Sequence, residues 1–166
     1  FLYARPEVQD LIEPLIVGHG WHLDERSEQP LIDYVEQYGT RDLAAFLSVP
    51  AALEFMESHD WPRVRAECYA QALTTKRMLE QTFGTEPICP ESFEWFSQLC
   101  PIRLPDNTDM AKLSQIFREH YQIEMPLITW NNFKIARLSV QIYTTADDLD
   151  AFVEALTTHL PACQPE

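Results

Sequence analysis

The sequence predicts an α+β fold, in which a small antiparallel sheet is covered by helices. Two observations carry this prediction. From about Asp60 onward the predicted elements follow in the order helix, strand, helix, hairpin, helix, an order typical of a layered α+β domain. The segment 133–160 then places a strand with alternating apolar residues directly before a capped helix. With 166 residues, of which 46% are hydrophobic, the chain can fill a core.

The strand predicted over 133–143 has two different faces. Side chains alternate along a strand, so one face is largely apolar and consists of Lys134, Ala136, Leu138, Val140 and Ile142. The opposite face carries Phe133, Ile135, Arg137, Ser139 and Gln141. The guanidinium of Arg137 can form a planar fork for a carboxylate or a phosphate in this setting. An ordinary surface charge explains the arginine as well.

The helix after this strand has clear start and stop signals. Thr145 and Asp148 have the spacing of a capping box. Pro161 is expected to end the helix. The apolar positions recur at helical spacing at Leu149, Phe152, Val153, Leu156 and Leu160.

The first third of the chain is predicted to be mostly irregular. Phe1 to Ala4 reads as a buried strand, residues 5–9 as a short helix or turn, and Gly18 to Trp21 as a loop. A helix with apolar positions from Leu43 to Met56 follows, and Pro50 is expected to kink or divide it.

The rest of the chain is predicted to alternate between helices and strands. Asp60 is expected to cap a long helix that has Pro62 in its first turn and ends at Gly84. A strand-like run follows over 93–104, and a helix starts near Thr108 and continues to Tyr121. Residues 125–130 and 133–143 are expected to pair as a hairpin through Asn131-Asn132.

Charge and cysteine content limit the classes of protein to consider. The excess of 26 Asp and Glu over 12 Lys and Arg gives a net charge of −14, which repels nucleic acid and anionic membranes. No apolar run approaches the roughly 20 residues that a membrane span requires. The four cysteines form no CxxC pair and no zinc-type spacing with the five histidines. We therefore expect no nucleic acid, membrane or metal partner, reduced thiols and a cytoplasmic location.

The first residues read as the interior of a protein. Phe1-Leu2-Tyr3-Ala4 resembles a buried strand without a methionine, turn or cap before it. We expect the carboxy-terminal part of a longer protein, with a trimmed or processed product as the alternative.

Three places in the sequence could bind a ligand. Gly39 and Thr40 lie directly before a helix and supply free amides, a hydroxyl and a favourable dipole for a phosphate, although most such threonines only cap a helix. Arg137 is the second place. His19, between two glycines, and Trp21 are further candidates, with a hydrogen-bonding loop residue and a core residue as the ordinary explanations.

Taken in order, these residues resemble one family. The segments FLYARPEVQDLIEPLIVGHGW, YGTRDLAAFLSVPAALEFMESHDWPRVR and FKIARLSVQIYTTADDLDAFVEAL are similar to the carboxy-terminal part of a class V aminotransferase-fold enzyme, in the isopenicillin N epimerase-like branch. The resemblance covers nearly the whole chain. Its most specific motifs are Gly39-Thr40-Arg41-Asp42 and the Arg137 strand with the following Tyr143-Thr144 and capped helix, whereas GHGW is a weaker match.

The resemblance implies an enzyme of fold type I that uses pyridoxal 5'-phosphate and works as a homodimer with shared active sites. It implies that Thr40 reaches the cofactor phosphate of the neighbouring subunit and that Arg137 binds the α-carboxylate of an amino acid-type substrate. Residues 1–59 would be a remnant of the large α/β cofactor domain and residues 60–166 the small C-terminal α+β domain. Charge-assisted contacts of these two kinds contribute roughly 1.5 to 3 kcal/mol each.

The resemblance also implies what the chain lacks. The Schiff-base lysine of the family precedes the strand that matches Phe1 to Ala4, and none of Lys76, Lys112 and Lys134 matches its position. We therefore expect no catalytic residue in this chain, an inactive isolated chain and no retained cofactor.

The resemblance also argues against one reaction, that of a persulfide-forming cysteine desulfurase. Related cysteine desulfurases carry a nucleophilic cysteine near the position of Ile123 or Glu124, and no cysteine lies between Cys100 and Cys163. Epimerisation, lyase chemistry and transamination of an amino acid or derived peptide stay open. The alternative from another class is a non-enzymatic α+β module that binds a partner or a small carboxylate.

Overall fold

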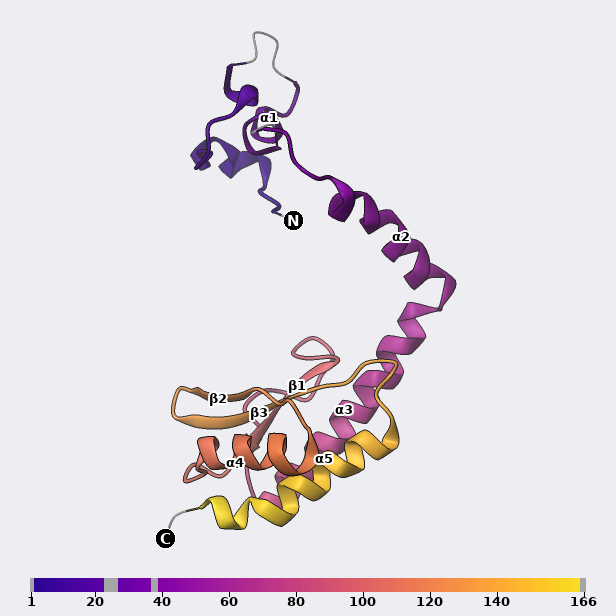
Figure 1. Ribbon diagram of the computed structural model, residues 1–166, viewed down its shortest axis with the longest axis vertical. Coiled ribbons are helices and arrows are strands. Elements are labelled where there is room, and N and C mark those ends of the chain that lie inside the picture. Colours follow the sequence, from indigo (N-terminus) through magenta and orange to yellow (C-terminus); the bar gives the residue numbers. More distant parts are fainter. Residues whose placement is uncertain (1, 23–26, 37–38, 165–166) are drawn as a thin grey trace. The chain divides into compact units, whose positions relative to one another are not determined.

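The computed structural model describes residues 2–22, 27–36 and 39–164. The chain divides into two compact units, Phe1–Leu53 and Glu54–Glu166 (Figure 1). The division predicted from the sequence, between residues 59 and 60, concerns the domains of a longer enzyme and stays a prediction.

The first unit is built from short helices. These are the 3-10 helices η1 (Pro6–Leu11) and η2 (His19–His22), the α-helix α1 (Pro30–Glu36) and the start of α2 (Ala44–Ser58). The strand predicted over Phe1 to Ala4 is wrong for residues 2–4, which form no strand and leave Leu2 and Tyr3 74% exposed; Phe1 lies outside the described residues. The predicted loop at Gly18–Trp21 contains η2, and α1 was not predicted.

Helix α2 differs from its prediction in its burial. Pro50 lies inside the helix and does not divide it, so of the two effects expected there only the kink stays a prediction. None of its residues is buried, and the expected apolar stripe includes Phe46 at 57% and Leu47 at 74% exposure. Helical spacing of apolar residues therefore predicted the helix but not a covered face.

The second unit has the predicted order of elements and confirms the α+β fold. Its elements are α3 (Trp61–Phe83), β1 (Leu99–Leu104), α4 (Met110–Ile116), the π-helix η3 (Phe117–Tyr121), β2 (Leu127–Trp130), β3 (Phe133–Ser139), α5 (Ala146–His159) and the 3-10 helix η4 (Pro161–Cys163).

The three strands form one antiparallel sheet in the order β1-β3-β2. The predicted hairpin is confirmed, because Trp130 pairs with Phe133 across Asn131 and Asn132, whose φ angles are 48° and 67°. Two successive residues with positive φ match the right-handed twist of a two-residue hairpin. In the central strand, Arg137 pairs with Pro101 of β1.

The helices of this unit lie on one side of the sheet, and its core lies between the two layers (Figure 1). Alternate strand residues point into this core, including Cys100, Ile102, Leu104, Ala136 and Leu138, all nearly inaccessible. The predicted apolar face is therefore confirmed at Ala136 and Leu138 of β3 and at Val140 directly after the strand. At Ile142 the prediction is wrong: the strand ends at Ser139, a turn closes with Thr144 N donating to Gln141 O at 2.8 Å, and Ile142 is 56% exposed.

The helix ends show which sequence signals acted. The capping box of Thr145 and Asp148 is present, and Gly84 ends α3 with a φ of 66°. Asp60 precedes α3 but has a φ of 48° and makes no capping bond with its side chain, which instead lies 3.5 Å from Arg63. The cap of α4 is Asp109, whose carboxylate accepts from Ala111 N and Lys112 N. The strand predicted over 93–104 is confined to its second half.

Candidate functional site

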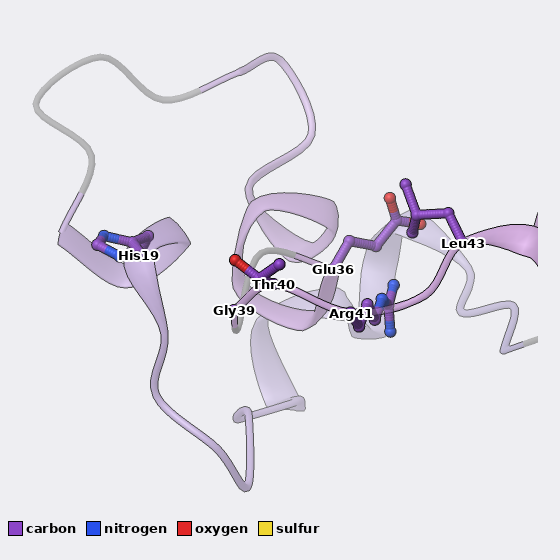
Figure 2. A pocket seen from close by; sticks show the side chains of 6 residues that line it. All are labelled: His19, Glu36, Gly39, Thr40, Arg41 and Leu43. Atoms are coloured by element: carbon purple, nitrogen blue, oxygen red, sulfur yellow. The ribbon is translucent and has the colours of Figure 1, made fainter.

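Three sequence-predicted residues line one pocket of the first unit. His19, from η2, and Gly39 and Thr40, from the segment before α2, surround a space of about 510 Å³ together with Glu36, Arg41 and Leu43 (Figure 2). In Figure 2 the Thr40 hydroxyl lies on the side of its segment that faces His19. The structure therefore brings together residues that are about 20 positions apart in the sequence.

The pocket has the donors that an anion requires. Gly39 has a φ of 144°, a backbone conformation that a residue with a Cβ rarely adopts, and nothing lies within 4 Å of the place a Cβ would occupy. Thr40 contributes a hydroxyl, and the Arg41 guanidinium lies 4.6 Å from the centre of the Phe46 ring. Glu36 is the one acidic residue among those that line the pocket.

Trp21 is not among the lining residues of this pocket. Its ring lies 5.0 Å from that of Tyr34, centre to centre, at an angle of 46°. The residue is 39% exposed. Its contact with Tyr34 places Trp21 against α1, the helix that was not predicted from the sequence.

Arg137 lies on the open face of the sheet, as its place in the alternating pattern predicted. The residue is exposed, while its neighbours Ala136 and Leu138 are buried. The backbone of Arg137 is fixed, because its N–H donates to Pro126 O at 3.0 Å and it pairs with Pro101. A second arginine on this face, Arg103, stacks over the Phe133 ring at 4.4 Å.

Arg137 also lines a pocket of about 280 Å³ in the second unit. Its other polar groups include Ser139 and Thr144, and the segment 121–126 and the first two turns of α5 supply apolar walls. This pocket was not predicted from the sequence. Gln122, with a φ of 56°, ends the π-helix and turns the chain into the segment that forms one wall.

The sequence-predicted site residues therefore fall into two groups. His19, Gly39 and Thr40 line the pocket of the first unit, and Arg137 lines that of the second. Each pocket is formed within its own unit, so each can be assigned a ligand from its own residues.

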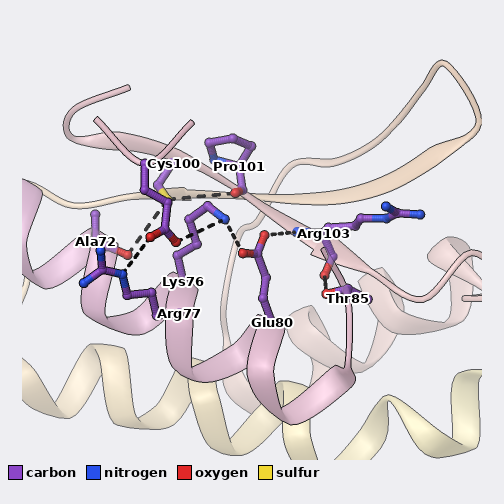
Figure 3. A network of polar contacts seen from close by, with 9 residues as sticks. Ala72, Lys76, Arg77, Glu80, Thr85, Cys100, Pro101 and Arg103 are labelled. Carbon is purple, nitrogen blue, oxygen red and sulfur yellow. Dashed lines mark hydrogen bonds and ion pairs between the residues drawn. The ribbon is translucent and has the colours of Figure 1, made fainter. Parts of the chain in front are cut away.

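A buried polar network connects α3 with β1 (Figure 3). Lys76 is completely buried and forms an ion pair with Glu80, which is 4% exposed. The other carboxylate oxygen of Glu80 accepts from Arg103 N at 3.1 Å, and Thr85 Oγ1 donates to Arg103 O at 2.8 Å. The network was not predicted from the sequence, although Lys76 and Glu80 have the i, i+4 spacing of a helical ion pair.

The other two lysines also have contacts. Lys112 Nζ donates to Ala162 O at 2.7 Å, and Lys134 Nζ donates to Thr129 Oγ1 at 3.3 Å. Neither lines the pocket of His19 and Thr40 or the pocket of Arg137.

The cysteine thiols are held in their protonated form. Burial raises the pKa of Cys100 to about 12 and is the main cause of a raised pKa at Cys68, Cys89 and Cys163. The thiolate is the reactive form of cysteine, so these residues are poor nucleophiles. All four are free thiols in the described structure.

Comparison with known proteins identifies relatives over most of the chain. The sequence is 30% identical over 165 residues to isopenicillin N epimerase of Amycolatopsis lactamdurans, and 26% identical over 166 residues to that of Streptomyces clavuligerus. It is 25% identical over 183 residues to a probable chloroplastic L-cysteine desulfhydrase of Arabidopsis thaliana. Each match includes 94% of this chain but only 42%, 42% and 35% of the relative. No protein-family model matches.

These matches make the chain a homologue of class V aminotransferase-like enzymes. Within that class, they confirm its resemblance to the isopenicillin N epimerase-like branch. The chain spans about two fifths of the length of the two epimerases. In the part of the chain that the structure describes, no helix combines the length and the apolar character needed to cross a bilayer.

Proposed function

We propose that this chain is part of a pyridoxal 5'-phosphate enzyme that acts on an amino acid or a derived peptide as an epimerase, lyase or transaminase. In this proposal Arg137 binds the substrate carboxylate, and Gly39 and Thr40 contact the cofactor phosphate of the partner subunit in a homodimer. Homology to two isopenicillin N epimerases and a desulfhydrase supports the enzyme class. The observation that carries the site assignment is the exposed Arg137 on a fixed strand beside a pocket.

The pocket of the first unit fits a phosphate group. Gly39 leaves its backbone open to close approach, Thr40 supplies a hydroxyl donor and Arg41 adds positive charge to the lining. The volume of about 510 Å³ is larger than a phosphate needs, so there is room for the rest of a ligand. His19, across the pocket, is a further donor in this proposal.

Pyridoxal phosphate, when bound, supplies an electron sink that stabilises negative charge at the substrate α-carbon. The contribution of this chain is to hold the substrate in a fixed orientation. A guanidinium offers two parallel N–H donors to a carboxylate. The antiparallel pairing of β3 with β1 and with β2 fixes the position of the backbone from which the Arg137 side chain extends. Because the bond that breaks must be aligned with the cofactor, a fixed carboxylate sets which α-carbon substituent reacts.

The structure also supports the argument against a persulfide-forming desulfurase. No cysteine is present between Cys100 and Cys163, and the raised pKa values of all four thiols disfavour the nucleophilic thiolate. Epimerase, lyase and transaminase activities all agree with the residues present.

The role of Arg137 can be tested in the full-length enzyme. We expect Arg137→Ala to lower kcat/KM for the amino acid substrate by about 10- to 100-fold, because a charge-assisted contact contributes roughly 1.5 to 3 kcal/mol. The cofactor absorbance should not change. Arg137→Lys keeps the charge but loses the fork and should recover only part of the activity.

A matched control is Arg118→Ala, on η3 and outside both pockets. It should leave kcat/KM unchanged. If the Arg137→Ala enzyme keeps wild-type kinetics, Arg137 is not the carboxylate contact, and a non-enzymatic role of this face becomes the better explanation.

A further inference from the structure

We propose that the pocket beside Arg137 binds the chain that extends from the substrate carboxylate, and that Ile123 and Met125 set the length of apolar chain it accepts. This inference rests on the proposed function, because it takes Arg137 as the carboxylate contact. It adds a substrate class, which is a carboxylate that carries an extended apolar or acyl chain.

The size of the pocket is the first argument. Its volume is about 280 Å³, whereas a cavity needs only about 10 to 15 Å³ to hold one water molecule. The space is therefore many times larger than a single small group requires, and a carboxylate group alone would leave most of it unfilled. A ligand that fits this space has a chain of several heavy atoms beyond its carboxylate.

The chemistry of the walls is the second argument. Ile123 and Met125 are half-buried on one side and pack against the hydrophobic core, as Leu149 does on the other. Phe152, which is 3% exposed, closes the wall formed by α5. Apolar walls beside the Arg137 guanidinium favour an amphipathic ligand. Burying each methylene of such a ligand is favourable, and its carboxylate remains paired with the guanidinium.

The acidic groups nearby do not oppose this assignment. Asp148 Oδ2 accepts from both Thr145 N and Thr145 Oγ1 at 2.8 Å, so its carboxylate is already used in the helix cap. Glu124 is exposed. Arg137 is the one Lys or Arg among the residues that line the pocket, which places the carboxylate end of the ligand at Arg137.

Backbone hydrogen bonds hold the segment that carries Ile123 and Met125 in place. Arg137 N donates to Pro126 O, and Ile123 N donates to Phe117 O, each at 3.0 Å. The capping box fixes the start of α5 on the opposite side. In this proposal a ligand anchored at Arg137 places its chain along Ile123 and Met125, and these two side chains limit the length of chain that the pocket accepts.

Straight-chain carboxylates can test the inference in the cofactor-loaded, full-length enzyme. Saturation-transfer NMR titrations would compare acetate, butyrate, hexanoate and octanoate. We expect the affinity to rise about two- to fourfold for each methylene that becomes buried, until the pocket is full. Arg137→Ala should lower the affinity for all four acids.

Two variants change the pocket in opposite directions. Ile123→Trp fills it and should abolish the rise with chain length while acetate still binds. Met125→Ala enlarges it and should move the end of the rise to a longer acid, which keeps the test available if the tryptophan variant does not fold. The matched control is Ile142→Trp, at an exposed residue outside the pocket lining, which should keep the wild-type series.

The outcomes separate the two proposals. If binding depends on Arg137 but not on chain length, or if both pocket variants keep the wild-type series, the proposed limit on chain length is wrong and the carboxylate role of Arg137 stands. If no acid depends on Arg137, the proposed function of that residue fails, and the inference fails with it.

Discussion

At the scale of single residues, Lys76 is the least expected feature of the sequence. A fully buried ammonium group is costly unless an anion pairs with it, because desolvation removes the stabilisation that water provides. Glu80 supplies the charge, and Glu91 lies 4.0 Å from Lys76 Nζ and 2.8 Å from Arg77 Nε. Lys76 thus neutralises the Glu80 carboxylate, which also accepts a hydrogen bond from the backbone N–H of Arg103 in β1.

Replacing Lys76 by methionine should destabilise the protein strongly. The substitution keeps an unbranched side chain of similar length but leaves Glu80 buried without its ion-pair partner, for which about 3 to 5 kcal/mol is typical. Urea unfolding would measure the loss. The matched control is Lys112→Met, which removes an exposed hydrogen bond and should cost less than about 1.5 kcal/mol.

A Lys76→Met protein as stable as the wild type would show that the pair does not stabilise the fold. The double variant Lys76→Met/Glu80→Met would then separate the charge pair from the backbone bond. It removes both charges but leaves Arg103 N without its acceptor, so some destabilisation should remain.

At the scale of elements, the same network protects an edge of the sheet. Strand β1 is an edge strand, and Arg103 N and Arg103 O turn away from β3 toward α3, where Glu80 and Thr85 bond to them. Pro101, two residues earlier in β1, has no backbone N–H and so leaves no free donor at its position on this edge. Edge strands with free backbone groups pair with other chains, and here side chains of the α3 end occupy those groups.

The start of α5 gives a prediction about acid stability. Hydrogen bonds from Thr145 lower the pKa of Asp148 below its usual value. Because the folded pKa is lowered, the stabilisation is present above the unfolded value, about 3.9, and is lost as the pH falls through the folded pKa. We expect Asp148→Asn to lower Tm at neutral pH and to narrow its gap to the wild type in acid.

Thermal unfolding followed at a series of pH values would measure this effect. Asp147→Asn is the control, because it removes a charge from the same turn but leaves the capping box intact. If the gap between wild type and Asp148→Asn is the same at neutral and at strongly acidic pH, the ionised carboxylate is not what stabilises the cap.

Local signals explain which elements could be predicted from the sequence. The capping box, the Asn131-Asn132 turn and Gly84 act through neighbouring residues, and each is confirmed. Asp60 had the composition of a cap, but its left-handed φ of 48° turns the side chain to Arg63 instead. Burial was less predictable for α2, none of whose residues is buried. Apolar residues at helical spacing indicate a helix, but they do not indicate whether another element packs against its apolar face.

The candidate site was predictable only in part, for a similar reason. Arg137 and Thr40 stand out because strand alternation and a helix start are visible in the sequence. The walls beside Arg137 come from a segment whose direction depends on a π-helix and on a left-handed residue, Gln122. No short-range pattern encodes that path, so Ile123 and Met125 could not be assigned to the pocket before the fold was known.

At the scale of the whole molecule, the hydrophobic core belongs to the second unit. Among the residues that the structure describes, the buried apolar side chains of this core lie between Val64 and Cys163, while in the first unit side chains such as Leu15 and Leu11 are 100% and 80% exposed. The relatives are more than twice as long as the part matched here. In the enzyme proposed above, we expect these exposed apolar side chains of the first unit to pack against segments outside this chain.

The same view predicts that the isolated 166-residue chain does not perform pyridoxal chemistry. That chemistry requires a lysine amine that is free to bond the cofactor. Lys76 is buried in an ion pair, and Lys112 and Lys134 lie outside both candidate pockets. Incubation with pyridoxal phosphate, borohydride reduction and peptide mapping should show only weak labelling, distributed over exposed amines. Stoichiometric labelling of one lysine at micromolar cofactor would contradict the prediction, and Lys112→Met and Lys134→Met variants would show which of these two lysines was responsible.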